Sequence, residues 1–316
     1  MSAWRNPQAI LLFISLGLLG ATFARPTMQL ERQTYRYVFV FDISQSMNVM
    51  DVGEVETPIT RLNYAKQSAI DSLSMLPCGT EVGLALFTGH RAFLLTTPIE
   101  TCDNYRELST MLNNIDWRMT WEARSEIAKG LYKSIALLQQ LEGQTRLVFI
   151  TDGHEAPPIN PDLPPRFPGT KGEIGGLIIG VGGKKLVPIP KFDAMGEQQG
   201  VWKVDEVSHV DAYTQARNAR ESTISTASGT EHLSSLRETY LQSLATKTGL
   251  NYYRLSGAKN LSQQMRGDTL GIPKIRTTDM RWFLALGSLC TFVAAILSTL
   301  IGNFKRSDFR RSNPIR

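Results

Sequence analysis

The segment from Tyr37 to Ser46 constrains the fold of this 316-residue chain more than any other. It begins with Tyr-Val-Phe-Val-Phe, in which both alternating sets of side chains are apolar. A strand with two apolar faces is typical of the centre of a parallel sheet, where helices cover both sides. Asp42, Ser44 and Ser46 follow at every second position. They come at the strand end where ligands bind in open α/β sheets.

Apolar periodicity elsewhere predicts that helices and strands alternate along the chain. Helices are expected at 61–76, 103–115, 122–141 and 233–248, and buried strands at 145–150, 175–181 and 251–255. Two apolar runs, 81–87 and 92–96, flank a four-residue turn and predict an antiparallel hairpin. We therefore expect a doubly wound α/β domain over residues 33–265, with mainly parallel strands and one antiparallel strand at an edge.

Three other segments lack a clear helical or buried-strand pattern. Residues 25–35 are predicted to be a polar lead-in to the first strand. Residues 191–205 predict a small hairpin in which Trp202 is a packing residue, and residues 208–230 predict a polar, mobile insertion.

Cys78 and Cys102 lie on either side of the predicted hairpin, at nearly opposite positions when counted outward from its turn. Opposite residues of an antiparallel pair are close enough for a disulfide if their Cβ atoms point toward each other. We expect a bridge between them, with two free thiols as the alternative. The third cysteine, Cys290, lies in an apolar segment and is expected to be inert.

Long apolar segments lie near both ends of the chain. Residues 9–24 follow Arg5 and end in small residues, so residues 1–25 are either a cleaved signal peptide or an uncleaved N-terminal anchor. Residues 282–302 carry no charge. At about 1.5 Å per residue they would span roughly 31 Å as a helix, which predicts a transmembrane helix.

The basic residues are concentrated beside these apolar segments. The formal net charge is +5, and the excess lies at the two ends of the chain, above all in residues 303–316. Positive charge next to a membrane helix marks its cytoplasmic side. We therefore expect an exported globular domain with a basic cytoplasmic tail, 303–316, and no nucleic-acid partner.

Oxygen-bearing side chains from three loops could form a cation site. Asp42, Ser44 and Ser46 share one loop, and Asp152 follows a second buried strand within Thr151-Asp152-Gly153. Both carboxylates should therefore reach the same edge of the sheet. A third loop offers the hydroxyl of Ser125 or that of Thr120. Oxygen donors of this kind suit a hard divalent cation.

This set resembles the metal-ion-dependent adhesion site of von Willebrand factor A domains. That site consists of Asp-x-Ser-x-Ser, a threonine from a second loop, and an aspartate that often stands in Thr-Asp-Gly. Asp42, Ser44, Ser46 and Asp152 match the first and third elements, and Ser125 replaces the threonine in the simplest alignment, with Thr120 as a competitor. The resemblance implies Mg²⁺, or alternatively Ca²⁺ or Mn²⁺, with one position left for the carboxylate of a protein partner.

Motifs in the C-terminal half resemble one particular subgroup of these domains. Residues 177–183, 187–190 and 236–253 are similar to membrane-anchored bacterial A domains associated with MoxR-type ATPases. Residues 152–158, together with 180–183 and 188–190, are most similar to the MxaL-type proteins of methanol-oxidation clusters. This similarity implies a bacterial inner-membrane protein with a periplasmic domain. Its role would be maturation or calcium insertion of methanol dehydrogenase, with that enzyme or another Mxa accessory protein as partner.

Other functions fit parts of the same pattern. An envelope adhesion or sensor module could use the same ion site. An aspartate-nucleophile phosphatase also carries an aspartate at a strand end, but it needs a second acid where Ser44 stands, and serine cannot act as a general acid near neutral pH. We therefore expect no enzyme activity. His154, beside Asp152, is more typical of a solvated loop residue than of a functional group.

Overall fold

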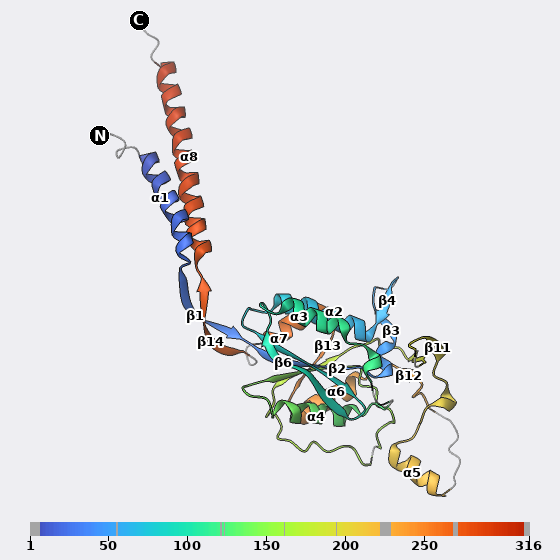
Figure 1. The fold of residues 1–316 in the computed structure, drawn as a ribbon. Helices are drawn as coiled ribbons and strands as arrows, with labels where there is room; N and C mark the ends of the chain where they lie inside the picture. Colours follow the sequence, from blue (N-terminus) through green and yellow to red (C-terminus); the bar gives the residue numbers. More distant parts are fainter. Residues whose placement is uncertain are drawn as a thin grey trace. The chain divides into compact units, whose positions relative to one another are not determined.

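The strand β2 (Arg36–Asp42), which ends at the aspartate of the Asp-x-Ser-x-Ser sequence, lies inside a six-stranded sheet (Figure 1). The structure is a computed structural model that describes residues 7–312 except 55, 121, 123, 161, 194, 222–228 and 268–270. The chain forms two units, one of residues 33–272 and one of residues 1–32 with 273–316. The sheet and all predicted site residues belong to the first unit.

The sheet has the order β13-β8-β7-β2-β5-β6. Its other strands are β5 (Glu81–Thr88), β6 (Arg91–Glu100), β7 (Arg146–Thr151), β8 (Gly176–Gly180) and β13 (Asn251–Arg254). All neighbouring strands are parallel except β5 and β6, so the expected α/β fold with one antiparallel edge strand is confirmed. Because β2 and β7 are parallel neighbours, Asp42 and Asp152 leave the sheet at the same edge.

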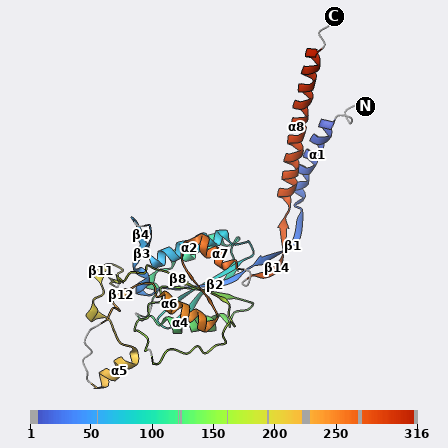
Figure 2. The ribbon, with the colours of Figure 1, turned by 180° about the vertical axis from the view of Figure 1, so that it is seen from behind.

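Helices cover both faces of the sheet, which explains the two apolar faces of β2 (Figures 1 and 2). The helices on one face are α2 (Arg61–Met75), α3 (Tyr105–Asn114) and α7 (Ala258–Met265), and those on the other are α4 (Ile127–Leu138) and α6 (Glu238–Thr248). Tyr37, Phe39 and Phe41 pack into the first core, and Val38 and Val40 pack into the second.

Short elements surround the carboxyl edge of the sheet. They are η3 (Gln45–Asn48), β3 (Met50–Gly53), β4 (Pro58–Thr60), η4 (Trp117–Met119), β9 (Val187–Pro188), β10 (Pro190–Phe192), β11 (Gln198–Val201), η5 (Val204–Glu206) and β12 (Leu233–Ser234). The strands among them form three two-stranded ribbons, β3-β4, β10-β11 and β9-β12. The ribbon β10-β11 is the hairpin predicted at 191–205, and Trp202 directly after it is half-buried.

Four segments differ from the sequence-based expectations. The helix predicted at 233–248 begins only at Glu238, because Leu233–Ser234 pair with β9 as the strand β12. The long helix predicted at 122–141 begins only at Ile127, because the backbone of Ser125 is hydrogen-bonded to Ala156 in both directions, each at 2.8 Å. The expected lead-in at 25–35 contains a strand, β1 (Thr27–Thr34), which pairs with β14 (Ile272–Asp279). The predicted insertion contains helix α5 (Ala212–Glu221), and its residues 222–228 lie outside the described part of the chain.

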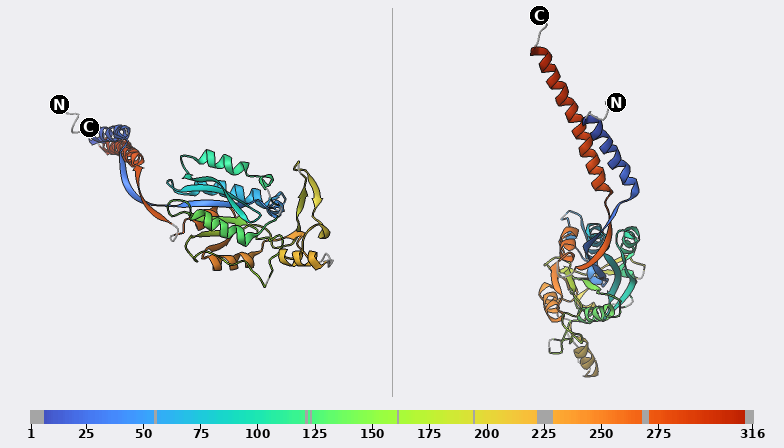
Figure 3. Two further views of the ribbon diagram at one scale, coloured as in Figure 1. Left: turned by 60° about the horizontal axis from the view of Figure 1, so that its bottom comes forward. Right: turned by 90° about the vertical axis from the view of Figure 1, so that its left-hand side faces the viewer.

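The second unit contains the two apolar ends of the chain. Helix α1 (Pro7–Ala21) continues into η2 (Thr22–Ala24) and β1, and β14 leads into α8 (Arg281–Ser312). Figure 3 shows α1 and α8 lying along each other. Both helices are long and apolar enough to cross a membrane, over Pro7–Ala24 and Arg281–Ser298. The helix α8 extends into the predicted basic tail as far as Ser312.

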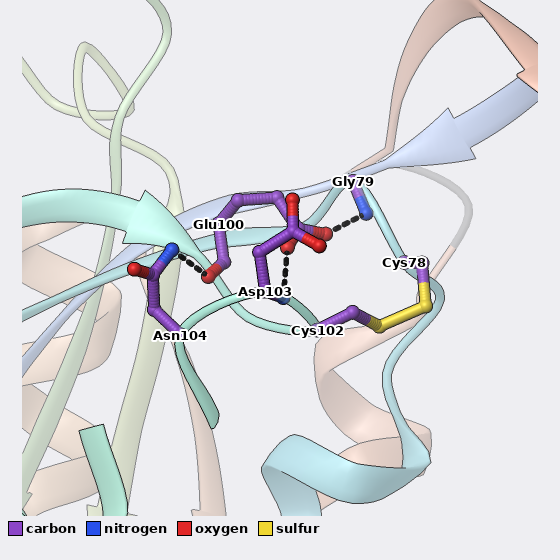
Figure 4. Close-up of a disulfide and its surroundings, with 6 residues drawn as sticks. All are labelled: Cys78, Gly79, Glu100, Cys102, Asp103 and Asn104. Atoms are coloured by element: carbon purple, nitrogen blue, oxygen red, sulfur yellow. Dashed lines mark hydrogen bonds between the residues drawn. A yellow bond between two sulfur atoms is a disulfide. The ribbon is translucent and has the colours of Figure 1, made fainter. Parts of the chain in front are cut away.

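The predicted disulfide between Cys78 and Cys102 is present, with 5.4 Å between the two Cα atoms (Figure 4). The bridge closes the base of the β5-β6 hairpin, where Glu81 faces Glu100. The Glu100 carboxylate also accepts hydrogen bonds from the backbone N–H groups of Gly79 and Asp103, so the residues beside both cysteines are bonded to one side chain.

Replacing Cys78 and Cys102 together by serine should lower the free energy of unfolding by about 3 kcal/mol, because a bridge across a loop of this length restricts the unfolded chain. Urea unfolding of the detergent-solubilised chain measures the change. Cys290→Ser, which removes a free cysteine from α8, is the control and should leave the midpoint unchanged. Equal midpoints for the double variant and the wild type would contradict a stabilising bridge.

Candidate metal centre

Two buried carboxylates, Asp42 and Asp152, meet at the carboxyl edge of the sheet. Neither residue has any solvent exposure. The carboxylate of Asp42 accepts hydrogen bonds from the backbone N–H of Ser44 at 2.9 Å and from the Thr151 hydroxyl at 2.6 Å. The latter bond joins the end of β2 to the end of β7. Asp152 in turn accepts the backbone N–H of His154 at 2.9 Å.

Three serine hydroxyls gather in a cavity at this end of the sheet. The Oγ atoms of Ser44 and Ser46 are 3.2 Å apart at the start of η3. The backbone bridge to Ala156 holds Ser125 in place, and its hydroxyl is buried without a hydrogen-bond partner among the described residues. All three serines line one cavity of ≈ 370 Å³. The structure therefore brings together hydroxyls from the first and third predicted loops.

Thr120, the alternative to Ser125, occupies a different place. Its hydroxyl lies 2.5 Å from that of Thr88 and donates to the backbone carbonyl of Glu122 at 2.9 Å. Thr120 is not among the residues that line the cavity with Ser44 and Ser46. The geometry thus favours Ser125 as the third-loop hydroxyl.

Arg61, the first residue of α2, is a buried cation that the sequence analysis did not identify. Its side chain has no solvent exposure. Its Nη1 donates to Asp152 at 2.5 Å and to the Ser234 hydroxyl at 2.6 Å. Its Nε and Nη2 form a bidentate pair with Asp51 at 2.9 and 2.6 Å. One guanidinium therefore joins the site to β3, to β12 and to α2.

The glycine pair after β8 makes room for this guanidinium. A Cβ at Gly182 would lie 2.8 Å from Nε of Arg61, and a Cβ at Gly183 would lie 3.0 Å from Oδ2 of Asp51. The backbone N–H of Gly183 also donates to that oxygen at 2.9 Å. The Gly-Gly pair in the sequence indicates that another group lies close to this backbone, because such a close approach requires glycine.

Because Arg61 is paired with Asp152 and not with Asp42, the pKa values of the two carboxylates are shifted in opposite directions. Burial opposes the ionisation of Asp152, but the Arg61 guanidinium beside it holds the pKa of Asp152 below its ordinary value. Burial, followed by the nearby Asp152 carboxylate, raises the pKa of Asp42 to about 7. Asp42 has no ion pair with a basic side chain in the described ranges of the chain.

The residues present fit a hard divalent cation. Ionised Asp42 needs a positive charge beside it, and Ser44, Ser46 and Ser125 offer neutral oxygen ligands. Within the described residues there is no group of three His, Cys, Asp or Glu side chains that could hold a metal. Such an ion would therefore depend on the serine hydroxyls together with Asp42 and Asp152.

His154 is placed differently from its sequence-based expectation. It was expected to be a solvated loop residue, but it is only 2% exposed. Its two ring nitrogens have no hydrogen-bond partner in the part of the chain that the structure describes, and it lines the cavity of the three serines. Burial lowers the pKa of its imidazole, so the ring is neutral near pH 7 and keeps one N–H donor.

Comparison with known families and curated proteins identifies relatives of part of this chain. Residues 37–154 match the von Willebrand factor type A domain family. A UPF0353 protein of Mycolicibacterium paratuberculosis is 30% identical over 174 residues, which cover 52% of this chain and 48% of the relative. A UPF0353 protein of Mycobacterium bovis is 29% identical over 167 residues with the same coverage. The chain spans about half the length of the curated relatives it matches.

The solved structures that this chain matches include two from Bacteroides. An aerotolerance-related membrane protein of Bacteroides fragilis is 18% identical, with a TM-score of 0.46 and coverage of 72% of this chain and 95% of the other. The conserved hypothetical protein BatB of Bacteroides thetaiotaomicron is 19% identical, with a TM-score of 0.47 and coverage of 73% and 97%.

Replacing Arg61 by methionine should destabilise the chain by about 3–5 kcal/mol, because it leaves Asp51 and Asp152 without their buried cation. Chemical unfolding monitored by circular dichroism measures the loss. Arg118→Met is the matched control. It breaks an ion pair with Asp116 whose side chains are 59% and 40% exposed, and an exposed pair contributes little to stability. Similar midpoints for the two variants would refute the role assigned to Arg61.

Proposed function

We propose that this chain, which contains a von Willebrand factor A domain, binds a divalent cation and through it the carboxylate of a partner protein. The observation that carries this proposal is the buried hydroxyl of Ser125, which has no partner within the described residues and lies in the same cavity as Ser44 and Ser46. A buried hydroxyl without a partner is unfavourable unless a ligand completes its bonding. Cavity and hydroxyls together suit a bound ion.

Each residue of the site has a distinct role in this proposal. Ser44, Ser46 and Ser125 supply oxygen ligands, and Asp42 supplies the negative charge that attracts the ion. Asp152 contributes negative charge, but Arg61 and Ser234 already donate to its Oδ2. Mg²⁺ is the ion that this mostly neutral oxygen set suits best, with Ca²⁺ and Mn²⁺ as alternatives.

The cavity beside the proposed ion suits a side chain from another protein. Its wall includes apolar residues, among them Ile189, Trp202 and Pro157, and the donors His154 and Arg124. A neutral imidazole N–H from His154 can donate to one oxygen of a partner carboxylate while the other oxygen binds the ion. The domain would then act by binding, with no reaction of its own.

The cellular role that we propose is assistance in the maturation or calcium insertion of a periplasmic methanol dehydrogenase. It rests on the similarity of residues 152–158, 180–183 and 188–190 to MxaL-type proteins. The partner would be that enzyme or another Mxa accessory protein. The basic residues that follow the apolar span of α8, in 305–316, support a cytoplasmic C-terminus, with the globular domain on the periplasmic side of a bacterial inner membrane.

The ion site is tested by titrating the purified chain with Mg²⁺ and Mn²⁺ in a calorimeter. Asp42→Ala should weaken binding at least about tenfold, because it removes the carboxylate that Arg61 does not neutralise. Ser208→Ala, which removes another hydroxyl that lines the cavity, is the matched control and should bind as the wild type does. Equal affinities for Asp42→Ala and the wild type would exclude the proposed ion site.

The cellular role requires a separate experiment. Deletion of the gene in its host should abolish growth on methanol and leave growth on a multicarbon substrate intact, and the methanol dehydrogenase made should lack calcium. Metal analysis of that enzyme measures the defect. Normal growth, with methanol dehydrogenase that contains its full calcium, would exclude a maturation role. It would not contradict the proposed ion site.

A further inference from the structure

The contact between α1 and α8 contains a reciprocal pair of serine hydrogen bonds. The hydroxyl of Ser15 donates to the backbone carbonyl of Ser288 at 3.0 Å, and the hydroxyl of Ser288 donates to the backbone carbonyl of Ser15 at 2.9 Å. The two Oγ atoms are 3.1 Å apart. Two segments that are 273 residues apart in the sequence are therefore joined through matching groups.

These serines are buried although the helices are otherwise mostly exposed. Ser15 and Ser288 are 8% and 6% exposed, whereas Phe13 and Leu16 on the same turn of α1 are 73% and 65% exposed. In a bilayer, exposed apolar side chains contact lipid, and polar side chains must find partners within the protein. The distribution of side chains on α1 thus suits a membrane helix that has one protein-facing side.

The face of α8 that carries Ser288 lies against α1. A Cβ at Gly287 would be in ordinary van der Waals contact with Leu18 of α1, 3.5 Å from its Cδ1, so the residue beside Ser288 also faces that helix. Close approach at small residues, combined with hydrogen bonds between serines, is the usual way in which membrane helices associate.

The pairing continues beyond the helices. The strands β1 and β14 form a two-stranded ribbon that directly follows α1 and directly precedes α8. The backbone N–H of Met280 also donates to the carbonyl of Pro26 at 2.9 Å. The residues where a signal peptidase would cut, 22–24, form a turn of 3₁₀-helix inside this paired unit.

We infer that the N-terminal segment is retained in the mature protein as a second membrane helix, whose partner is α8 of the same chain. Cleavage after Ala24 would remove α1 and leave the Ser288 hydroxyl facing lipid without the carbonyl of Ser15. Retention places Arg5 and the basic C-terminal residues on the same side of the membrane, as expected when both lie in the cytoplasm. This inference does not depend on the proposed ion site.

The mass of the full chain, extracted from membranes through a C-terminal tag, tests retention directly. The expected mass is that of a chain that still contains residues 7–24, and a mass that lacks residues 1–24 would overturn the inference.

Cysteine crosslinking tests the partner. In a Cys290→Ser background, the pair Ser15→Cys and Ser288→Cys should form a disulfide within one chain on mild oxidation. The control pair Gly17→Cys and Ser288→Cys should not, because a Cβ at Gly17 has no neighbouring atom within 4 Å. Two differently tagged copies that carry one cysteine each would crosslink only if the helices of different chains pair. A crosslink between copies, without one inside a chain, would overturn the assignment to the same chain.

Discussion

The burial of two neighbouring carboxylates, of which one is paired with a buried guanidinium, is the constraint on which the site depends. Asp42 and Asp152 are placed together because their strands are parallel neighbours that end at one edge of the sheet. Arg61 compensates Asp152 and is itself fixed by Asp51 and Ser234. Since an unpaired buried charge is strongly unfavourable, the loops around this edge are arranged to bring these groups into contact.

This arrangement leaves the two carboxylates with different surroundings. Asp152 has a cationic partner, whereas the partners of Asp42 in the described part of the chain are hydrogen-bond donors, among them Thr151 and Ser44. The hydroxyl of Ser125 and the ring of His154, which have no partner among the described residues, lie in the cavity that is lined by Ser44 and Ser46 of the Asp42 loop. Asp42 therefore lacks a cationic partner, and nearby polar groups lack hydrogen-bond partners among the described residues, which supports the proposal that an ion and a partner carboxylate bind here.

The features that could be predicted from the sequence are those set by local pattern. The apolar run of β2 predicted a central strand, and the spacing of Cys78 and Cys102 about one turn predicted their bridge. The Gly-Gly pair indicates that some group lies close to the backbone, but not that Arg61 is that group, because the burial of Arg61 depends on contacts with residues 51, 152 and 234, which no local pattern links. The strand β1 was missed for the same reason, since its partner β14 lies more than two hundred residues away.

The contacts of Arg61 also limit how this sequence can diverge. A shorter residue at position 61 leaves Asp51 and Asp152 uncompensated, and any side chain at Gly182 collides with the guanidinium. Replacing this arginine would therefore require changes at Asp51 and Asp152 as well. Gly182 would stay constrained in any case, because its φ of +131° strains other residues. Residues 51, 61 and 152 thus depend on one another, although they lie on three different segments of the chain.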